Sequence, residues 1–385
     1  MTAHVNNHIH TTYSFSPYSP AEAVKRAKNS GLVTAGIMDH DSVGGLEEFI
    51  VAGREENIGV TVGFEMRVSF ADTPFVGRRI NNPDQNSVAY LAMHGIPHDK
   101  ISECEAFLKP YREARNKRNK KMTAKLNEYV KIAGISIDFE QDVLPLSLHD
   151  KGGSVTERHI LYALAQKILD KTTPGATVVA FLQSYFQITL HGKNLARLSD
   201  AQEPWYRYYL LGVLKGHLVS RFYIDADEEL PDYRDFIALA ERIGAISAYA
   251  YLGDVGDSVT GDKASQAFED AYLEELVLFL KDAGFRAITY MPARNTRAQL
   301  QRLIGLCEKH DLFQICGEDI NSPFQPFVCE ALMQPIFSHL ITAAYALIGH
   351  ERAGYGNGLF SKKMMQKMPL LKERIDYFAS KGRAE

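Results

Sequence analysis

Two histidines near the amino terminus have the spacing of a metal-binding pair. His8 and His10 are separated by one residue in a stretch that reads as an extended strand. Side chains in a strand alternate between its two faces, so these two imidazoles project to the same side. Two imidazoles that meet at one point are the beginning of a site for a divalent transition metal.

Other short apolar runs also end in acids or histidines. The runs 33–38, 58–62, 90–93 and 312–316 lead into Asp39-His40-Asp41, Gly63-Phe64-Glu65, His94 and Glu318-Asp319. Each run has strand length, and helical patterns fill the segments 20–30, 44–56 and 296–309. Strands that alternate with helices predict a parallel sheet or barrel, whose site lies at the carboxyl ends of the strands. We therefore expect these side chains to converge on one metal site.

The composition is ordinary for a globular enzyme. A chain of 385 residues suits one large domain with an insertion, or two domains. No apolar run reaches the ~18 residues of a membrane span, and the polar amino terminus is unlike a signal peptide. Four cysteines without CxxC spacing indicate free thiols and argue against a cysteine-bound zinc. We predict a cytoplasmic protein, and the net charge of −4 argues against a general nucleic-acid binder.

The character of the chain changes between residues 100 and 232. The segment 101–131 is highly charged and helical, and strand-like runs are scarce until the strand and helix pattern resumes near Pro231. The resumed pattern predicts strands at 245–249, 286–290 and 312–316 and helices at 233–243, 264–283 and 296–309. We predict a barrel from residues 1–99 and 233–385, with 100–232 as a mainly helical insertion or cap.

These motifs, in this order, resemble the PHP (polymerase and histidinol phosphatase) family. The matching text is His8-Ile-His10-Thr-Thr-Tyr-Ser14, Asp39-His40-Asp41, Gly63-Phe-Glu65, His94 and Gly317-Glu-Asp319-Ile-Asn321. The resemblance implies an α/β fold, a distorted (βα)7 TIM-like barrel. It also implies one to three divalent metal ions per chain, Zn, Mn or Fe, which activate water for attack on a phosphate ester.

The resemblance implies a role for each ligand. The positions of the first metal site are matched by His8, His10, Glu65 and Asp319. Glu65 would bridge to a second metal that His94, rather than His98, also binds. His40 matches a ligand of a third site and would serve in catalysis. The segment 155–164 looks like the Arg-x-His segment of the family's small phosphoesterases, which implies that Arg158 and His159 meet the substrate phosphate.

The chain departs from the family pattern at three places. Asn321 stands where the family usually has histidine, and an asparagine oxygen is a weaker ligand for zinc-like metals. Tyr249 stands in the strand where Ala-His-Pro is usual, and Asp254 could reach back as a substitute ligand. Phe15 and Ser16 stand where Asp or His is frequent. These departures predict that the second and third metal positions are weaker than the first.

Several charged residues have more than one interpretation. Asp39 is expected to orient His40, and Asp41 to have a role in the turn. The basic segment 109–125 reads mainly as a solvated helix face. Lys263, in a loop after a strand, could present its charge to an anion.

The leading hypothesis is a metal-dependent phosphoesterase that acts on a small phosphorylated metabolite or nucleotide. The alternatives are a PHP-type nuclease, a catalytically weakened metal-binding protein, and a metal-dependent hydrolase of a non-phosphate substrate. No Ser-His-Asp set, P-loop or dinucleotide fingerprint is present, so a serine hydrolase, an NTPase and a dehydrogenase are not proposed.

Overall fold

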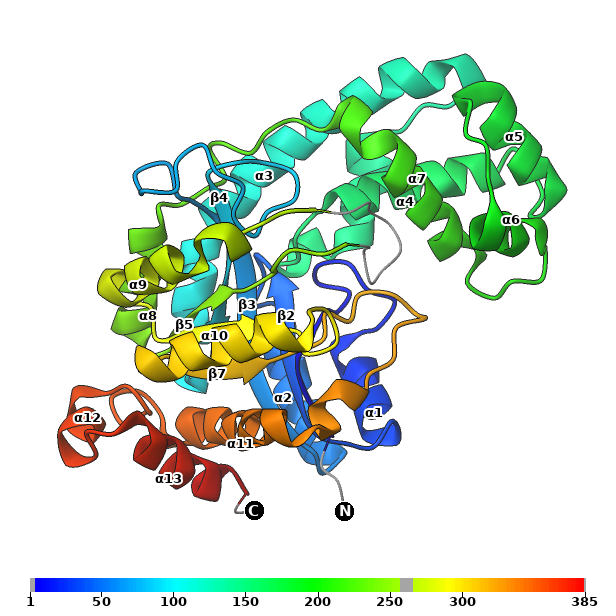
Figure 1. Ribbon diagram of the computed structural model, residues 1–385. Coiled ribbons are helices and arrows are strands. Elements are labelled where there is room, and N and C mark those ends of the chain that lie inside the picture. Colours follow the sequence, from blue (N-terminus) through cyan, green and yellow to red (C-terminus); the bar gives the residue numbers. More distant parts are fainter. Residues whose placement is uncertain (1–3, 257–265, 384–385) are drawn as a thin grey trace.

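A computed structural model describes residues 4–256 and 266–383. Within these residues, seven strands form one sheet in sequence order. They are β1 (His4–Ile9), β2 (Leu32–His40), β3 (Gly59–Ser69), β4 (Val88–His94), β5 (Ile246–Ala250), β6 (Ala287–Tyr290) and β7 (Phe313–Cys316). Backbone hydrogen bonds join His10 and His8 of the β1 segment to Ile320 beyond β7. The sheet therefore curls into a nearly closed barrel, as expected (Figure 1).

One strand runs against the others. β4 is antiparallel to both β3 and β5, while the remaining neighbours are parallel. The carboxyl end of β4 therefore does not lie at the same edge as those of β1, β2 and β7, and our expectation for the run 90–93 was wrong on this point. β3 also continues to Ser69, so Glu65 lies inside the strand rather than beyond its end.

Helices cover the outside of the barrel. The apolar sides of these helices pack on the strands. The helices are α1 (Pro20–Asn29), α2 (Leu46–Glu55), α8 (Tyr233–Ile243), α9 (Leu273–Ala283) and α10 (Arg297–Lys309). Most begin and end near the predicted positions because capping signals fix them. Thr296 and Gln299, for example, form a capping box at the start of α10. α9 begins at Leu273, later than predicted, and the residues 257–265 lie outside the described part of the chain.

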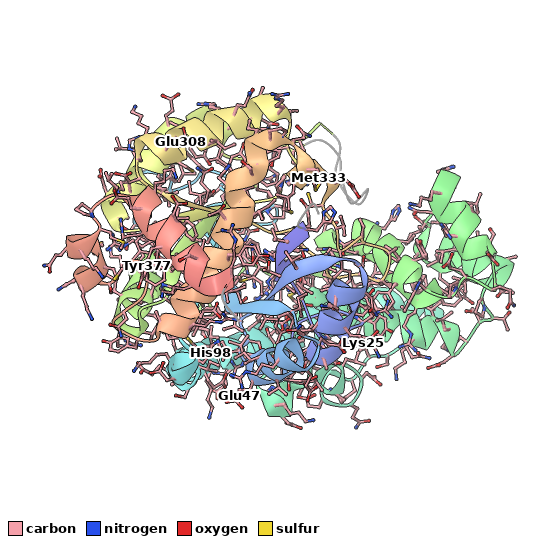
Figure 2. All side chains as sticks on the ribbon, turned by 90° about the horizontal axis from the view of Figure 1, so that it is seen from below. Lys25, Glu47, His98, Glu308, Met333 and Tyr377 are labelled. Carbon is pink, nitrogen blue, oxygen red and sulfur yellow. The ribbon has the colours of Figure 1, made fainter. Side chains whose placement is uncertain are left out.

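The lower end of the barrel is plugged by apolar side chains. Met38, Phe313 and Ile315 pack with Leu347 of α11 (Ser338–Ala353). α13 (Leu371–Arg383) crosses α11, and α12 (Lys362–Lys367) precedes it. Figure 2, which views the molecule from below, shows α11 and α13 side by side. These apolar side chains therefore close this end of the barrel.

The insertion is helical, as predicted, and has a core of its own. It contains α3 (Ile101–Val130), α4 (Glu157–Leu169), α5 (Ala176–Phe186), α6 (Gly192–Ser199) and α7 (Tyr206–Phe222). α3 joins the two parts, because its Leu108 packs in the barrel core and its Leu126 in the insertion core (Figure 1). The first and last residues of the insertion, 100 and 232, stay a prediction.

Candidate metal centre

Three side chains from two strands meet inside the upper barrel. His8 and His10 come from the β1 segment, and Glu65 comes from β3. The Nε2 atoms of the histidines are 3.3 Å apart, and Glu65 Oε1 lies 3.4 Å from His8 Nε2 and 3.3 Å from His10 Nε2. All three residues are buried. The structure thus brings together three of the residues that the sequence indicated.

These separations fit a metal ion. Ligand atoms about 2.0–2.2 Å from a tetrahedral metal stand about 3.3 Å from one another. The Nε2 atoms of His8 and His10 face each other at 3.3 Å. The lone pairs of two such imidazole nitrogens repel each other unless a proton or a cation lies between them. The donor set of two imidazoles and a carboxylate suits Zn, Mn or Fe. His8, His10 and Glu65 would therefore hold a divalent ion.

Asp319 is the fourth member of this group. Its Oδ1 lies 3.1 Å from His10 Nε2, and the same oxygen accepts a hydrogen bond of 2.7 Å from the side-chain amide of Asn321. Asn321 therefore presents nitrogen toward Asp319 and holds that carboxylate in place. In this arrangement Asn321 orients the Asp319 carboxylate, and its role as a metal ligand stays a prediction.

His40 approaches from β2 on the more open side. Its Nδ1 is buried and lies 3.1 Å from Glu65 Oε1, but it has no hydrogen-bond partner among the residues that the structure describes. The His40 side chain is 25% exposed, against 1% for His10. A buried nitrogen without a partner beside a carboxylate is what a second ion bridged by Glu65 would satisfy.

His94 lies below the group on the same interior face. In the pairing of β3 with β4, Ala92 lies opposite Glu65. His94 follows Ala92 by two residues, so it lies two positions below Glu65, toward the plugged end. Within the described part of the chain, the buried Nε2 of His94 has no hydrogen-bond partner, and His94 does not belong to the compact group of His8, His10 and Glu65. His94 can therefore complete a metal position only beneath Glu65.

Asp39 supports His10 rather than His40. Its carboxylate accepts hydrogen bonds from Thr11 N (2.7 Å), Thr11 Oγ1 (2.6 Å) and Ser14 Oγ (2.6 Å). Ser14 Oγ in turn lies 3.2 Å from His10 Nδ1. Asp39 thus fixes the loop behind the His10 ring, which sets the orientation of that imidazole.

The group is strongly coupled electrostatically. Burial alone would lower the pKa of His10, but Asp319 and Glu65 outweigh it and raise the pKa to about 10. Because the Asp319 side chain is 40% exposed, water screens part of this attraction. Burial lowers the pKa of His40 and of His94 to about 3, so both imidazoles are neutral and can ligate at pH 7.

Arg158 and His159 have different environments at the start of α4. Arg158 is half-buried, its guanidinium lies 6.0 Å from the Phe15 ring centre, and it makes no ion pair within the described residues. His159 is buried, and its Nδ1 accepts the backbone N–H of Thr156 at 3.0 Å. The His159 ring also packs edge-on against Phe15. The structure leaves Arg158 available to a ligand, but the helix cap and the packing speak against catalysis by His159.

Asp254, the suggested substitute ligand, is tied to a loop outside the compact group of His8, His10 and Glu65. Asp254 Oδ1 accepts the N–H of Phe268 at 2.5 Å, which ties it to the loop that precedes α9. In the pairing of β4 with β5, Ala248 faces the barrel interior. Tyr249, the next residue, therefore points outward, and its hydroxyl donates to Glu269 Oε1 at 3.2 Å. The tyrosine therefore supplies no ligand to the barrel interior, and the ligand that the family usually has in this strand is absent from this position. Lys263 lies outside the described residues.

Three polar residues near the centre escaped the sequence reasoning. Arg67 follows Glu65 on the same face of β3, and Tyr90 pairs with Arg67 and lies beside His40, with ring centres 5.8 Å apart. Arg115 of α3 is buried and pairs with Asp41. The period of two on β3 would have indicated Arg67 had the strand been extended past Glu65.

The expected solvated face of α3 holds for its lysines but not for its arginines. Arg112, Arg115 and Arg118 are spaced by three residues, and all are buried. Arg118 and Arg67 both pair with Glu229. The arginines thus tie the insertion to the barrel.

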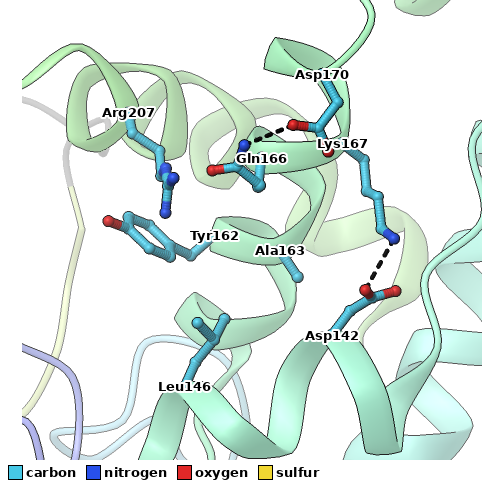
Figure 3. Close-up of a pocket in the computed structure, with 8 residues that line it drawn as sticks. All are labelled: Asp142, Leu146, Tyr162, Ala163, Gln166, Lys167, Asp170 and Arg207. Carbon is cyan, nitrogen blue, oxygen red and sulfur yellow. Dashed lines mark hydrogen bonds and ion pairs between the residues drawn. The ribbon is translucent and has the colours of Figure 1, made fainter.

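A small pocket in the insertion lies apart from these residues (Figure 3). It has a volume of about 120 Å³ and lies between α4, Leu146 and Arg207. The ion pair between Lys167 and Asp142 spans it at 2.8 Å. None of its lining residues belongs to the metal group, so it does not enter the chemistry.

The fold and this group of residues define a barrel protein with a candidate site for a divalent metal ion. The profile of the PHP domain family matches residues 6–285, so the chain belongs to that family. A 5'-3' exoribonuclease from Haemophilus influenzae (strain ATCC 51907 / DSM 11121 / KW20 / Rd) is 33% identical over 70 residues, 18% of this chain. Those residues are 26% of the length of that enzyme, so the likeness spans about a quarter of it.

Two solved structures share the fold. One is a candidate metal-dependent phosphoesterase from Bifidobacterium adolescentis, with a TM-score of 0.57 and 19% identity. The other is an amidohydrolase from Chromobacterium violaceum with bound sulfate and no metal, with a TM-score of 0.54 and 18% identity. Each likeness covers 89% of this chain and 97% of the other. Within the described residues, no helix is both long and apolar enough to cross a membrane.

Proposed function

We propose that this protein is a metal-dependent phosphoesterase that cleaves a phosphate monoester of a small metabolite or nucleotide. The observation that carries the proposal is the meeting of His8, His10, Glu65 and Asp319 within hydrogen-bond distances. Arg158, which makes no ion pair within the described residues, lies over the Phe15 ring. A divalent ion held there would supply hydroxide at neutral pH and neutralise charge on the phosphoryl oxygens.

The protein residues would divide the remaining work. His8, His10, Glu65 and Asp319 would hold the ion, and Asn321 and Asp39 would keep two of these ligands oriented. His40 is neutral at pH 7 and reaches the more exposed side, where it could bind a second ion or accept a proton.

Arg158 would bind the phosphate. Its guanidinium stands over Phe15, which directly follows the Ser14 that supports His10. A guanidinium offers bidentate hydrogen bonds to a phosphate, so it can fix the ester relative to the metal. The sulfate in the Chromobacterium violaceum structure agrees with an anion site in this fold.

The test is a screen for phosphate release. Metal-loaded protein would be given sugar phosphates, amino-alcohol phosphates and nucleotides, with a chelated sample as the control. Release from one class that stops on chelation is expected. Tight metal binding without release from any phosphoester would favour the weakened metal-binding protein, and release of amine from an amide would favour hydrolysis of another bond.

A second candidate, a nuclease, is favoured by an aromatic surface beside the centre. Tyr209 of α7 stacks on the exposed Phe324 of the loop after β7, with ring centres 4.6 Å apart. Arg207 lies over Tyr162 at 4.5 Å. Aromatic rings interleaved with arginines can stack unpaired bases. Removal of nucleotides from single-stranded RNA by the metal-loaded protein, weakened in Tyr209→Ala, would decide for this candidate.

A further inference from the structure

The loop that follows His40 is held by the insertion. β2 ends at His40, and the next residue, Asp41, donates its N–H to Glu65 O at 2.8 Å. Asp41 then turns the chain with a φ of +49°, in the left-handed region that non-glycine residues seldom adopt. The conformation of Asp41 therefore decides where the backbone leaves the strand directly after His40.

Two arginines of α3 grip Asp41 at two points. Arg115 Nη1 donates to the Asp41 carboxylate, and Arg112 Nη1 donates to the Asp41 carbonyl oxygen at 3.2 Å. Arg115 is 4% and Asp41 5% exposed, so water screens this ion pair little. The arginines are three residues apart and therefore lie on one face of α3.

Other contacts close the same junction. Ser42 Oγ donates to the carbonyl of Gly152 at 2.7 Å, and Ser154 N donates to the carbonyl of Tyr13 at 2.7 Å. The insertion thus contacts the loops that carry His40 and His10, and among its described residues Arg112 and Arg115 bind Asp41, the residue after His40.

We propose that Arg115 is a positioning residue that acts through Asp41 on His40, so that docking of the insertion completes the metal position which His40 serves. The inference rests on the proposed function, because it takes His40 to be a metal ligand. Arg115 itself touches neither metal nor substrate; it keeps the loop in the one conformation that aims Nδ1 of His40 at Glu65.

The experiment is a Mn²⁺ titration of the metal-free full chain by chelator competition. Two classes of site are expected, and His40→Gln identifies the class to which His40 belongs by weakening it. Arg115→Gln and Asp41→Asn should weaken that class about tenfold or more and leave the other class unchanged. Asparagine has the shape of aspartate and tolerates the left-handed region, so Asp41→Asn removes the charge alone.

The controls separate positioning from stability. Arg118→Gln removes another buried arginine of α3, one that pairs with Glu229 and does not touch Asp41, so both classes should keep their affinities. Arg115→Lys should recover part of the affinity. The double variant Asp41→Asn with Arg115→Gln leaves no unpaired charge and should weaken the His40 class as much as either single variant and no more.

Three results would overturn the inference. The first is an unchanged His40 class in Arg115→Gln and Asp41→Asn, or in the double variant where the single variants do not fold. The second is an equal loss in Arg118→Gln. The third is an unchanged titration in His40→Gln, which would remove His40 as a ligand yet leave the site of His8 and His10, and the proposed hydrolase, standing.

Discussion

Buried charge governs the chemistry of His10. In the absence of metal, Asp319 and Glu65 favour the protonated imidazole and raise the pKa of His10 to about 10. A metal must displace that proton, because only the neutral imidazole can ligate. Proton release therefore opposes metal binding at every pH below the raised pKa.

We accordingly predict that the apparent affinity for Mn²⁺ rises with pH between 6 and 9, by up to about tenfold per pH unit. The sign follows from the raised pKa of His10. In the metal-free protein the imidazole keeps its proton throughout this range, and metal binding releases that proton. Titration at constant ionic strength would measure the slope. His94→Gln serves as the control, because burial keeps His94 neutral there and no proton is lost from it. An affinity independent of pH would contradict the coupling between His10 and Asp319.

The two histidines of β1 should be indispensable. His8→Ala combined with His10→Ala removes both imidazoles of the first site, so the tight class of metal and all activity should disappear. The fold should survive, since the helices and the barrel core do not depend on these rings. Elemental analysis and circular dichroism would check both statements. Retained metal at wild-type stoichiometry would show that the tight site lies elsewhere.

Arg158 should matter for substrate and not for metal. A charge-assisted bidentate contact is worth roughly 1.5–3 kcal/mol, so Arg158→Ala should lower kcat/KM by about 10- to 150-fold. The metal content should stay constant. Arg286→Ala, directly before β6, offers a matched loss of a half-buried arginine that pairs with Glu241 and should have little effect. Wild-type kcat/KM in Arg158→Ala would place Arg158 away from the phosphate.

At the residue scale, the sequence indicated the candidate metal ligands better than the buried residues that surround and orient them. His8, His10 and Glu65 were visible because strand ends and a period of two place side chains predictably. Arg67 was missed because β3 was expected to end before Glu65. Arg115 was taken for part of a solvated face because a charged helix face looks the same in the sequence whether water or a buried carboxylate lies opposite it.

At the element scale, the direction of β4 could have been inferred. Parallel neighbours need a crossover of a dozen or more residues, usually a helix. The segment 70–87 between β3 and β4 has no helix. That absence favours an antiparallel return, and it moves His94 away from the edge where the other ligands gather.

The crossing of α11 and α13 depends on two glycines. A methyl group at Gly349 would lie 1.9 Å from the carbonyl oxygen of Phe378, and one at Gly382 would lie 1.9 Å from that of Tyr345. The two helices therefore approach more closely than any larger residue allows.

We predict that Gly349→Ala lowers the free energy of unfolding by about 1–3 kcal/mol through overpacking, without changing metal affinity. Chemical denaturation of the metal-free protein would measure it. Gly305→Ala in α10 is the control, because nothing lies within 4 Å of the added methyl and helix propensity should then stabilise by up to about 1 kcal/mol. Equal effects of the two substitutions would mean that the helices are not in close contact at Gly349.

At the scale of the whole molecule, a barrel supplies the ligands and a helical insertion supplies their surroundings. The change of composition near residue 100 was enough to predict the insertion, because its helices carry a period of 3.6 without intervening strands. How it docks could not be predicted, since this depends on buried ion pairs between residues far apart in sequence, such as Arg67 and Glu229.

The central claim is that one strong metal position lies among His8, His10, Glu65 and Asp319. Anomalous scattering from crystals grown with Mn²⁺ and without phosphate tests it most directly. We predict the strongest peak between the Nε2 atoms of His8 and His10, Glu65 Oε1 and Asp319 Oδ1, with weaker occupancy beside His40 and His94. No peak among these four atoms, or three peaks of equal occupancy, would contradict this account of the centre.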